Sequence, residues 1–249
     1  MGSVLALGRS CACCPEQTVL SVRNLTRHVR NGSSRRLRML NLGCGPARDI
    51  SIVLSQPHHA DIQVDCVERD PNAIAYAKEV CREHASQVNF IQGNVLTYCP
   101  QQGYELVWAG GLFDYFNDRV FRPLLRRTCG CIAPTGEVVV GNFSVRNPNV
   151  GWMRFCCWEI HRRTEAELLA LAAAIGTPPH RMSAGSEPAG VNLFLHIVGE
   201  EREAPTTACA RIVHSRARWF AMEKRDDGAF VSAPNSSGIG EADFVSNFL

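Results

Sequence analysis

The stretch "LNLGCGPARD", residues 40–49, decides how this sequence is expected to fold. Residues 36–43 have the pattern of a strand that ends in a glycine turn, with Gly43 and Gly45 in that turn. Glycines there let the backbone turn sharply and approach a ligand closely, with the N-terminus of the next helix behind them. The same pattern also suits a tight turn that binds nothing, so a binding site needs support from other segments.

Composition and charge narrow the class of protein. The chain has 249 residues, of which 45% are hydrophobic and 20% charged, and a net charge of +2. Such values are typical of a globular protein with a substantial core, and they do not favour binding to nucleic acid. No apolar run reaches the roughly 18 residues of a membrane span, and the run near the start is too short for a signal peptide. We therefore expect no membrane partner.

The cysteines indicate the compartment. Twelve cysteines are scattered through apolar segments rather than arranged as a disulfide framework, which favours the reducing cytoplasm. Cys11, Cys13 and Cys14 form a C-x-C-C cluster, but no second cluster with ligand spacing accompanies it, so no metal site is expected.

Hydrophobic periodicity predicts alternating strands and helices. Strands are expected at 36–43, 62–69, 88–96, 104–110, 136–144, 181–187 and 191–200, and helices at 18–30, 71–85, 118–132 and 164–176. Pro123 should kink the third of these helices or delay its start, whereas Thr164 and Glu167 form a capping box and Gly176 ends the fourth. The predicted fold is an α/β, Rossmann-like, doubly wound sheet of seven strands, mostly parallel, closed by an antiparallel hairpin.

Three regions follow from this pattern. Residues 1–35 are expected to be an N-terminal extension with a lid helix, and residues 36–200 the ligand-binding domain. Residues 201–249 are polar and rich in Ala, Ser, Gly and Asp, which predicts a poorly packed or disordered tail. The oligomeric state is left open.

Ligand-type residues stand at the ends of four predicted strands. Besides the first glycine turn, Glu68 ends the second strand, where an acid can bind both hydroxyls of a ribose. Asn94 ends the third, where an adenine amino group would be recognised, and two glycines with aromatic residues end the fourth. Because the carboxyl ends of parallel strands share one edge of the sheet, these residues predict one nucleoside site.

This arrangement resembles the class I S-adenosylmethionine (SAM) dependent methyltransferases over residues 36–200. The resemblance implies that SAM is the cosubstrate and that a small molecule is the partner. The residues implied to contact SAM are Asn41, Gly43, Cys44, Gly45, Glu68, Arg69, Asn94, Val95, Ala109, Gly110 and Phe113. The family usually has Asp or Glu where Asn41 stands, and a neutral amide holds the methionine ammonium less strongly.

A narrower resemblance rests on longer motifs. The segments AGGLFDYF, VVVGNFSVRNP, W-x-x-x-x-R-T-E-x-E-L-L-x-L and EPAGVNLFLHI occur in that order. Together they resemble the bacterial methyltransferases of extracellular-factor (3-hydroxypalmitic acid methyl ester) biosynthesis. That group usually carries Glu, Asp and Tyr where this chain has Met153, Cys157 and Arg162. The fold and the SAM site therefore transfer better than the acceptor chemistry.

The acceptor side of the site is expected around "NVGWMRFCCWEIHRR", residues 149–163. Its composition would suit a core helix, a metal site, a membrane-surface patch or a cap over a ligand, and its position after the fifth strand favours the cap. Candidate catalytic residues are Tyr115, Asn142, Ser144, Trp158 and His161. Six aromatic residues could form a cation–π box around the sulfonium: Trp108, Phe113, Tyr115, Phe116, Trp152 and Trp158.

Three functions remain open at this point. The first is methyl transfer to a small carboxylate, hydroxyl or amine in bacterial secondary or signal metabolism. The second is the cyclisation of SAM itself to azetidine-2-carboxylate with release of methylthioadenosine, as in the methyltransferase-like azetidine-2-carboxylate synthases. Asn41, the aromatic residues and the missing acids all suit that reaction. The third is SAM binding without catalysis.

Overall fold

A computed structural model of the chain describes residues 37–56, 62–100, 103–148, 150–187, 190–200, 222–224 and 230–232. The chain divides into two compact units, Met1–Arg202 and Glu203–Leu249. The predicted lid helix at 18–30 and the N-terminal cysteine cluster lie outside the described residues.

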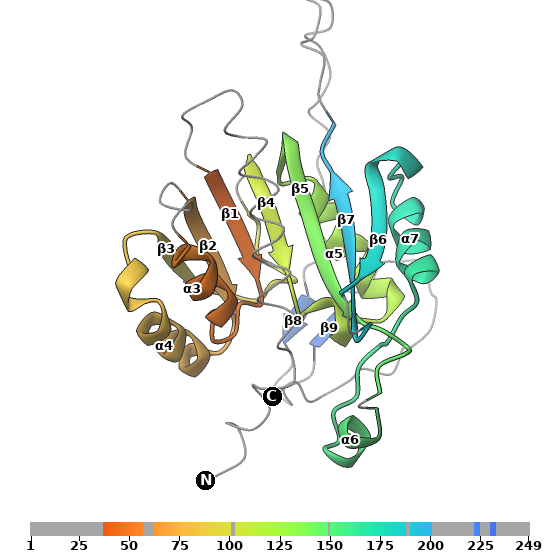
Figure 1. The fold of residues 1–249 in the computed structure, drawn as a ribbon, viewed down its shortest axis with the longest axis horizontal. Coiled ribbons are helices and arrows are strands. Elements are labelled where there is room, and N and C mark those ends of the chain that lie inside the picture. Colours follow the sequence, from red (N-terminus) through yellow and green to blue (C-terminus); the bar gives the residue numbers. More distant parts are fainter. Residues whose placement is uncertain are drawn as a thin grey trace, which may run out of the picture. The chain divides into compact units, whose positions relative to one another are not determined.

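The described part of the first unit is built on a seven-stranded sheet (Figure 1). Its strands are β1 (Leu37–Leu42), β2 (Ile62–Glu68), β3 (Val88–Gln92), β4 (Tyr104–Ala109), β5 (Ile132–Phe143), β6 (Met182–Ser186) and β7 (Asn192–Val198). They lie in the order β3-β2-β1-β4-β5-β7-β6. The first five pair in parallel, and β7 runs antiparallel to both β5 and β6. The predicted fold and its closing hairpin are confirmed.

Helices cover both faces of this sheet. They are α3 (Arg48–Leu54), α4 (Pro71–Val80), α5 (Asp118–Cys129), α6 (Val150–Phe155) and α7 (Glu165–Ala174), with short 3₁₀ helices at Arg82–His84, Phe113–Tyr115 and Pro179–Arg181. Helices α3 and α4 cover one face over β1 and β2, whereas α5 and α7 pack on the other (Figure 1). In Figure 1, α6 stands away from the sheet, beyond the carboxyl ends of the parallel strands.

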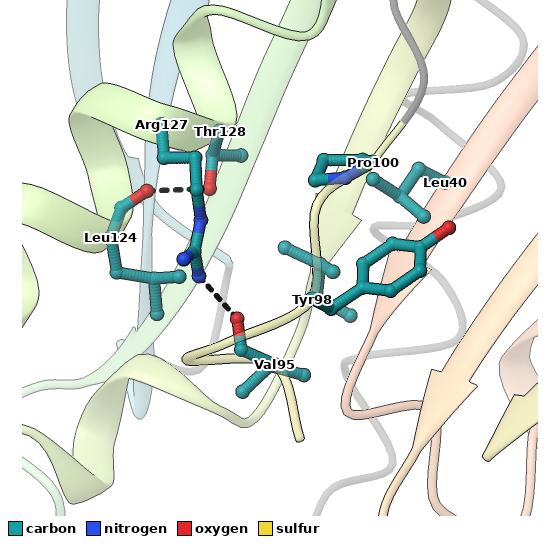
Figure 2. A pocket seen from close by; sticks show the side chains of 8 residues that line it. Leu40, Val95, Tyr98, Pro100, Leu124, Arg127 and Thr128 are labelled. Atoms are coloured by element: carbon teal, nitrogen blue, oxygen red, sulfur yellow. Dashed lines mark hydrogen bonds between the residues drawn. The ribbon is translucent and has the colours of Figure 1, made fainter. Parts of the chain in front are cut away.

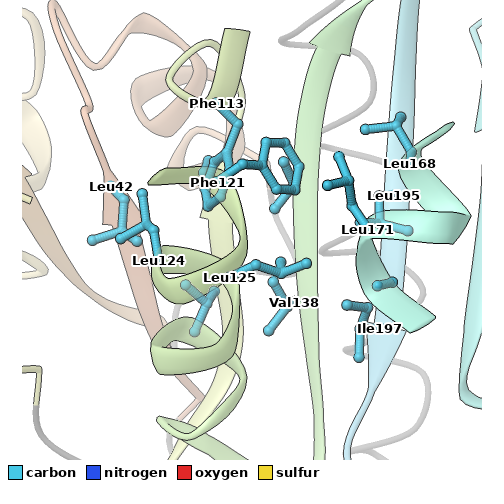
Figure 3. Packing of buried hydrophobic residues seen from close by; sticks show 14 of the residues in the cluster. Leu42, Phe113, Phe121, Leu124, Leu125, Val138, Leu168, Leu171, Leu195 and Ile197 are labelled. Atoms are coloured by element: carbon cyan, nitrogen blue, oxygen red, sulfur yellow. The ribbon is translucent and has the colours of Figure 1, made fainter. Parts of the chain in front are cut away.

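Each face has its own apolar core. Met39 and Ile50 are fully buried in the core that α3 and α4 cover. Phe121, Leu168 and Leu195 bring α5, α7 and β7 together in the other core (Figure 3). Every residue of β4 is buried, as expected for a central parallel strand that has both faces covered.

The capping of α7 follows the prediction. The Glu167 N–H donates to Thr164 Oγ1 at 3.2 Å, and the Thr164 N–H donates to Glu167 Oε2 at 2.7 Å. Gly176 follows the end of the helix with a φ of 90°, a conformation that favours glycine. The predicted capping box and stop are therefore confirmed.

Some predicted boundaries are wrong. The start of α5 is not delayed by Pro123, because the Asn117 side chain caps the helix by accepting from the N–H groups of Arg119 and Val120. The third strand ends at Gln92 rather than at 96. The reason is that Asn94 Oδ1 accepts from the Leu96 N–H and turns the chain.

Two further elements differ from the prediction. Strand β5 begins at Ile132 rather than at 136, because a register shift against β4 absorbs the Ala-Pro-Thr-Gly segment that has the composition of a turn. Helix α6 was not predicted as a helix, since only Met153 among its residues is buried and the segment shows no amphipathic repeat.

The second unit contains the short antiparallel pair β8 (Met222–Lys224) and β9 (Phe230–Ser232). The rest of the predicted tail lies outside the described residues, so its order stays a prediction. Among the helices that the structure describes, none has the length and apolar character needed to cross a bilayer.

The close approach of β4 and β5 yields a stability prediction. A Cβ added to Gly141 would lie 2.2 Å from the backbone oxygen of Gly110, whereas one added to Gly185 on β6 would meet nothing within 4 Å. Gly141→Ala should therefore lower the free energy of unfolding by about 2 kcal/mol or more, since two backbones would have to separate. Gly185→Ala is the matched control and should change it by less than about 1 kcal/mol. Urea denaturation measures both, and equal stabilities would contradict the prediction.

Candidate active site at the carboxyl edge of the sheet

The turn after β1 is fastened to β2. Gly43 and Gly45 have φ values of 65° and 49°, in the left-handed region where glycine is favoured. Ala47, the N-cap of α3, adopts the same region at a φ of 49°, which is uncommon for a residue with a Cβ. The N–H groups of Gly43 and Cys44 donate to the Val67 carbonyl at 2.9 and 3.3 Å. The position of this turn is thus fixed by the end of β2.

Glu68 joins the two strand ends. Its Oε2 accepts from the Gly45 N–H at 2.9 Å, and its Oε1 accepts from the N–H groups of Arg69 and Asp70 at 2.7 and 3.0 Å. An ionised carboxylate has about four lone-pair sites, so these three bonds leave it able to accept a further one. The half-buried Glu68 is thereby held in place next to the switch point between β1 and β4.

Asn41 contributes a buried donor with no partner. The residue is 1% exposed, and its Nδ2 is the one buried side-chain nitrogen or oxygen of the described residues that lacks a hydrogen bond. An unpaired buried amide costs about 1–3 kcal/mol and calls for an explanation. Together with the turn and the Glu68 carboxylate, this donor fits a site for a polar ligand.

The third strand end presents an exposed amide. Asn94 Oδ1 already accepts from the Leu96 N–H at 2.9 Å, but a carbonyl oxygen has a second lone pair. The carbonyl of Val95 accepts from the Arg127 guanidinium, which also donates to the Leu96 carbonyl at 2.6 Å. This segment is therefore held by α5.

A small cavity lies beside that segment (Figure 2). It is lined by Leu40, Leu42, Val95, Tyr98, Pro100, Leu124, Arg127 and Thr128. It has room for about one water molecule, so it is a packing defect rather than a substrate pocket.

The predicted box of six aromatic residues is wrong. Trp108 and Phe113 are both fully buried, but they belong to the cores on opposite faces of the sheet. The indole N–H of Trp108 donates to Asp49 Oδ2 at 2.9 Å, and the Phe113 ring packs edge-on against Phe121. Trp152, on α6, is 62% exposed. The candidates therefore lie on separate elements, with Trp108 on β4 and Phe113 in the 3₁₀ helix that follows it.

A smaller aromatic group does form on the acceptor side. The Trp158 indole N–H donates to the Tyr115 hydroxyl oxygen at 3.0 Å, and the Trp158 ring packs edge-on against Phe143 at 5.6 Å. Burial raises the pKa of Tyr115, and the charge of Asp114 adds to that effect, while the bond from Trp158 opposes it. Tyr115 therefore keeps its proton at neutral pH.

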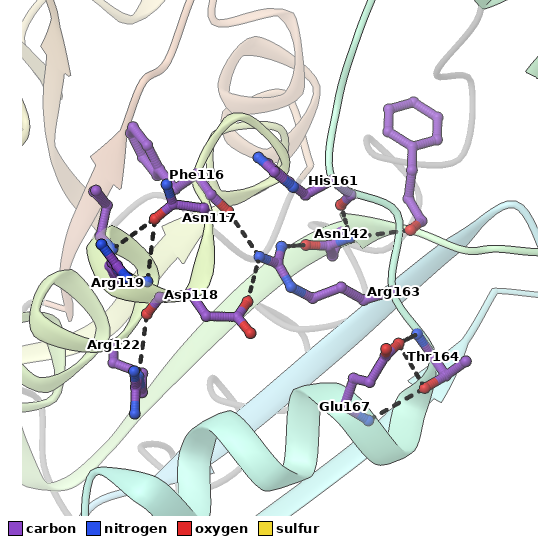
Figure 4. Close-up of polar contacts among 12 residues, drawn as sticks. Phe116, Asn117, Asp118, Arg119, Arg122, Asn142, His161, Arg163, Thr164 and Glu167 are labelled. Carbon is purple, nitrogen blue, oxygen red and sulfur yellow. Dashed lines mark hydrogen bonds and ion pairs between the residues drawn. The ribbon is translucent and has the colours of Figure 1, made fainter. Parts of the chain in front are cut away.

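Arg163 organises this side of the edge (Figure 4). Its buried guanidinium donates to Asn142 Oδ1 at 2.8 Å, to the Phe116 carbonyl at 2.7 Å and to Asp118 Oδ1 at 2.9 Å. It also lies over the Phe121 ring at 4.7 Å. One side chain thereby connects the end of β5, the turn after β4 and the start of α5.

Three of the predicted catalytic residues take part in this hydrogen-bond network or lie next to it. Asn142 Nδ2 donates to the carbonyl of His161 at 2.9 Å and to that of Phe143 at 3.0 Å, so the amide is occupied by the protein itself. Ser144 is buried, and its hydroxyl oxygen accepts from the Arg146 N–H. The side chain of His161 is exposed, and its backbone rather than its ring joins the network.

Asp114 is a site residue that the sequence analysis missed. It is 2% exposed, and its Oδ1 accepts from the Phe143 N–H at 2.5 Å. Burial raises the pKa of Asp114 to about 7, although the Phe143 bond and the Arg163 charge act in the opposite direction. Its carbonyl accepts from the His161 N–H at 2.7 Å. The signal was available, since an acid amid apolar residues in GLFDYF suggests a buried carboxyl.

A metal centre is not supported by the residues that the structure describes, since they contain no group of three or more His, Cys, Asp or Glu side chains placed to hold an ion.

Comparisons with known proteins agree with this geometry. Residues 39–136 match the family described as "Methyltransferase domain". No curated protein is significantly similar in sequence to the chain.

Three solved structures illustrate the fold. A possible exported protein from Bordetella parapertussis is 16% identical, with a TM-score of 0.57 over 72% of this chain and 66% of its own. An O-methyltransferase family protein from Burkholderia thailandensis is 13% identical, with a TM-score of 0.54 over 75% and 59%. Magnesium protoporphyrin IX methyltransferase from Synechocystis, solved with bound S-adenosylhomocysteine (SAH), is 16% identical, with a TM-score of 0.55 over 75% and 84%. The chain thus spans about two thirds or less of the first two.

The buried carboxyl of Asp114 yields a pH prediction. Its pKa is about 7 in the folded protein and about 4 in an unfolded chain, so between these values the folded state binds more protons. The stabilising contribution is complete below pH 4 and is lost as the pH rises through 7. Asp114→Asn mimics the protonated form and should remove this loss. In urea denaturation from pH 4 to 8, the free energy of unfolding of the variant should rise relative to that of the parent by at most about 4 kcal/mol. Parallel profiles would contradict the prediction.

Proposed function

We propose that the chain is a class I SAM-dependent methyltransferase that transfers the methyl group of SAM to a small-molecule acceptor at the carboxyl edge of its sheet. The match of residues 39–136 to the family described as "Methyltransferase domain" supports this proposal. The observation that carries the proposal is Glu68. Its carboxylate is fixed by the Gly45 N–H and the turn after β2, beside the switch point where ligands of doubly wound sheets bind.

The cosubstrate half of the site comes from the first three strand ends. Glu68 would accept from the ribose hydroxyls of SAM, because it has lone pairs left after its backbone bonds. Asn94 would bind on the adenine side, and Asn41 would donate its unpaired N–H to the carboxylate of the methionine part. The remaining contacts would come from Gly43, Cys44, Gly45, Arg69, Val95, Ala109, Gly110 and the backbone of Phe113.

The acceptor half comes from the turn after β4 and from the segment after α6. When bound, SAM supplies a methyl group on a sulfonium, and transfer forms a bond from acceptor oxygen or nitrogen to that carbon as the S–C bond breaks. Tyr115 keeps its proton at neutral pH, and its hydroxyl oxygen accepts from Trp158, so this phenol would line the acceptor side and exclude water from it. Asn142 and Ser144 would act through the shape of the strand end that they hold.

The chemistry of the acceptor is a finer part of the proposal. A carboxylate, a hydroxyl or an amine would accept a methyl group here, and the narrower sequence resemblance favours an acyl compound of bacterial secondary or signal metabolism. A carboxylate needs no base because it carries no proton to lose. A carboxylate acceptor suits this edge of the sheet, because the Asp114 carboxyl is buried and the His161 side chain is exposed to water, so neither has to act as a base.

Asn41 favours a second candidate, the cyclisation of SAM to azetidine-2-carboxylate. In that reaction the methionine amine attacks its own γ-carbon and methylthioadenosine leaves. The attacking amine must be unprotonated, and a neutral amide at position 41 stabilises the ammonium form less than a carboxylate would.

Product analysis separates the candidates. Incubation of the pure protein with SAM alone should leave SAM unconverted, and addition of a pool of hydroxy-fatty acids and other small carboxylates should release SAH together with a product heavier by one methylene. Mass spectrometry identifies both. Methylthioadenosine with an azetidine amino acid from SAM alone would instead establish the cyclase. Tight SAM binding without turnover would indicate a non-catalytic SAM-binding protein.

Glu68 provides the second test. Glu68→Gln removes the charge that binds the ribose hydroxyls, so it should weaken SAM binding by about 10- to 100-fold, as expected for a hydrogen bond to a charged group. Glu79→Gln, on the exposed side of α4, is the matched control and should bind SAM like the parent. Isothermal titration calorimetry measures the affinities, and circular dichroism checks the fold. An unchanged affinity for a folded Glu68→Gln protein would show that the ribose lies elsewhere.

A further inference from the structure

Helix α6 carries an exposed aromatic pair. Trp152 and Phe155 are the most exposed of the large hydrophobic side chains that the structure describes, at 62% and 77%. Their rings stack with centroids 5.4 Å apart and planes at 25°. Helix α6 stands away from the sheet (Figure 1), and two exposed, stacked rings on it leave an apolar surface in water, which is unusual unless something binds there.

Contacts of Met153 and Trp158 hold helix α6 in place. Met153 is buried, and its sulfur accepts from the Asn147 amide at 3.5 Å. The backbone N–H of Trp158 donates to the Met153 carbonyl at 2.9 Å, and Cys157 between them has a φ of 53°. Trp158 is itself held by Tyr115. The helix is therefore presented outward by the same contacts that build the acceptor side.

The charges around the pair are mostly positive. Between residues 144 and 163 the sequence contains four arginines and a histidine but one acid, Glu159. Arg163 is buried, whereas Arg146 and Arg154 are exposed, and Arg154 lies between the two aromatic residues in the sequence. The binding partner should thus offer an apolar phase next to negative charge.

We propose that Trp152 and Phe155 insert into the surface of a bilayer that contains anionic lipids, with Arg146 and Arg154 on the headgroups. Tryptophan is enriched at the membrane interface, and basic residues near the surface add attraction to anionic lipids. A second copy of the chain fits less well, because a two-fold contact would place Arg154 near its own symmetry mate. This proposal differs from the expectation of no membrane partner, which rested on the lack of an apolar run long enough to span a membrane.

Vesicle binding by the full chain tests the proposal. The protein should sediment with vesicles of phosphatidylglycerol and phosphatidylcholine but not with vesicles of phosphatidylcholine alone, and salt should release it. Trp152→Ser with Phe155→Ser should reduce binding at least tenfold, and Arg154→Glu by about tenfold. Val198→Ser is the matched control, since Val198 is 44% exposed at the far end of β7 and should not matter.

The outcomes are distinct because all the substituted side chains are exposed and the fold can be checked by SAM binding. The proposal is supported if the Trp152→Ser, Phe155→Ser double variant and Arg154→Glu lose vesicle binding while Val198→Ser keeps it. Failure of the parent to bind anionic vesicles, equal binding of the double variant, or a dimer that only the double variant dissociates would overturn it. None of these results bears on methyl transfer, which is measured separately.

Discussion

The buried charge of Arg163 is the constraint on which the acceptor side depends. A guanidinium removed from water is tolerated only if its donors are paired, and here Asn142, the Phe116 carbonyl and Asp118 pair them. This requirement brings the chain back to the sheet after α6, where Arg163 forms an isolated bridge with Ser144. The chain therefore leaves the sheet after Ser144 and returns to it at Arg163, and the contacts of Arg163 hold these two points together.

Different kinds of interaction hold the two halves of the carboxyl edge of the sheet in place. On the proposed cosubstrate side, backbone N–H groups and the Glu68 carboxylate fix a tight turn. On the acceptor side, buried polar side chains connect segments that are far apart in the sequence. Methyl transfer depends on the placement of two reactants relative to each other, so rigidity in both halves is what the proposed reaction needs from the protein. The contact of Gly110 with Gly141 brings the backbones of β4 and β5 together at the point where the halves meet.

What could be predicted from the sequence depended on local signals. Continuous apolar runs identified the strands, and Thr164 with Glu167 identified the start of α7, because each is a short-range pattern. The predicted start of α5 at residue 118 is confirmed, but the delay expected at Pro123 does not occur, because the Asn117 side chain caps the helix upstream of the proline. The partners of Arg163 and the bond from Phe143 to Asp114 could not be predicted, because they depend on contacts between β5, the turn after β4 and the segment after α6. The same holds for the division of Trp108 and Phe113 between two cores.

Residue type and position after the fourth and fifth strands indicated five candidates for the acceptor side in the sequence, and burial now separates them. Asn142 and Ser144 are enclosed and bonded within the protein, and the ring of His161 is in water. Of the five, Tyr115 and Trp158 are the two that are half-buried and hydrogen-bonded to each other. The indole N–H of Trp158 donates to the Tyr115 hydroxyl oxygen. Because this hydrogen bond fixes the orientation of the Tyr115 ring, the phenol would present a constant surface to the acceptor in the proposed reaction.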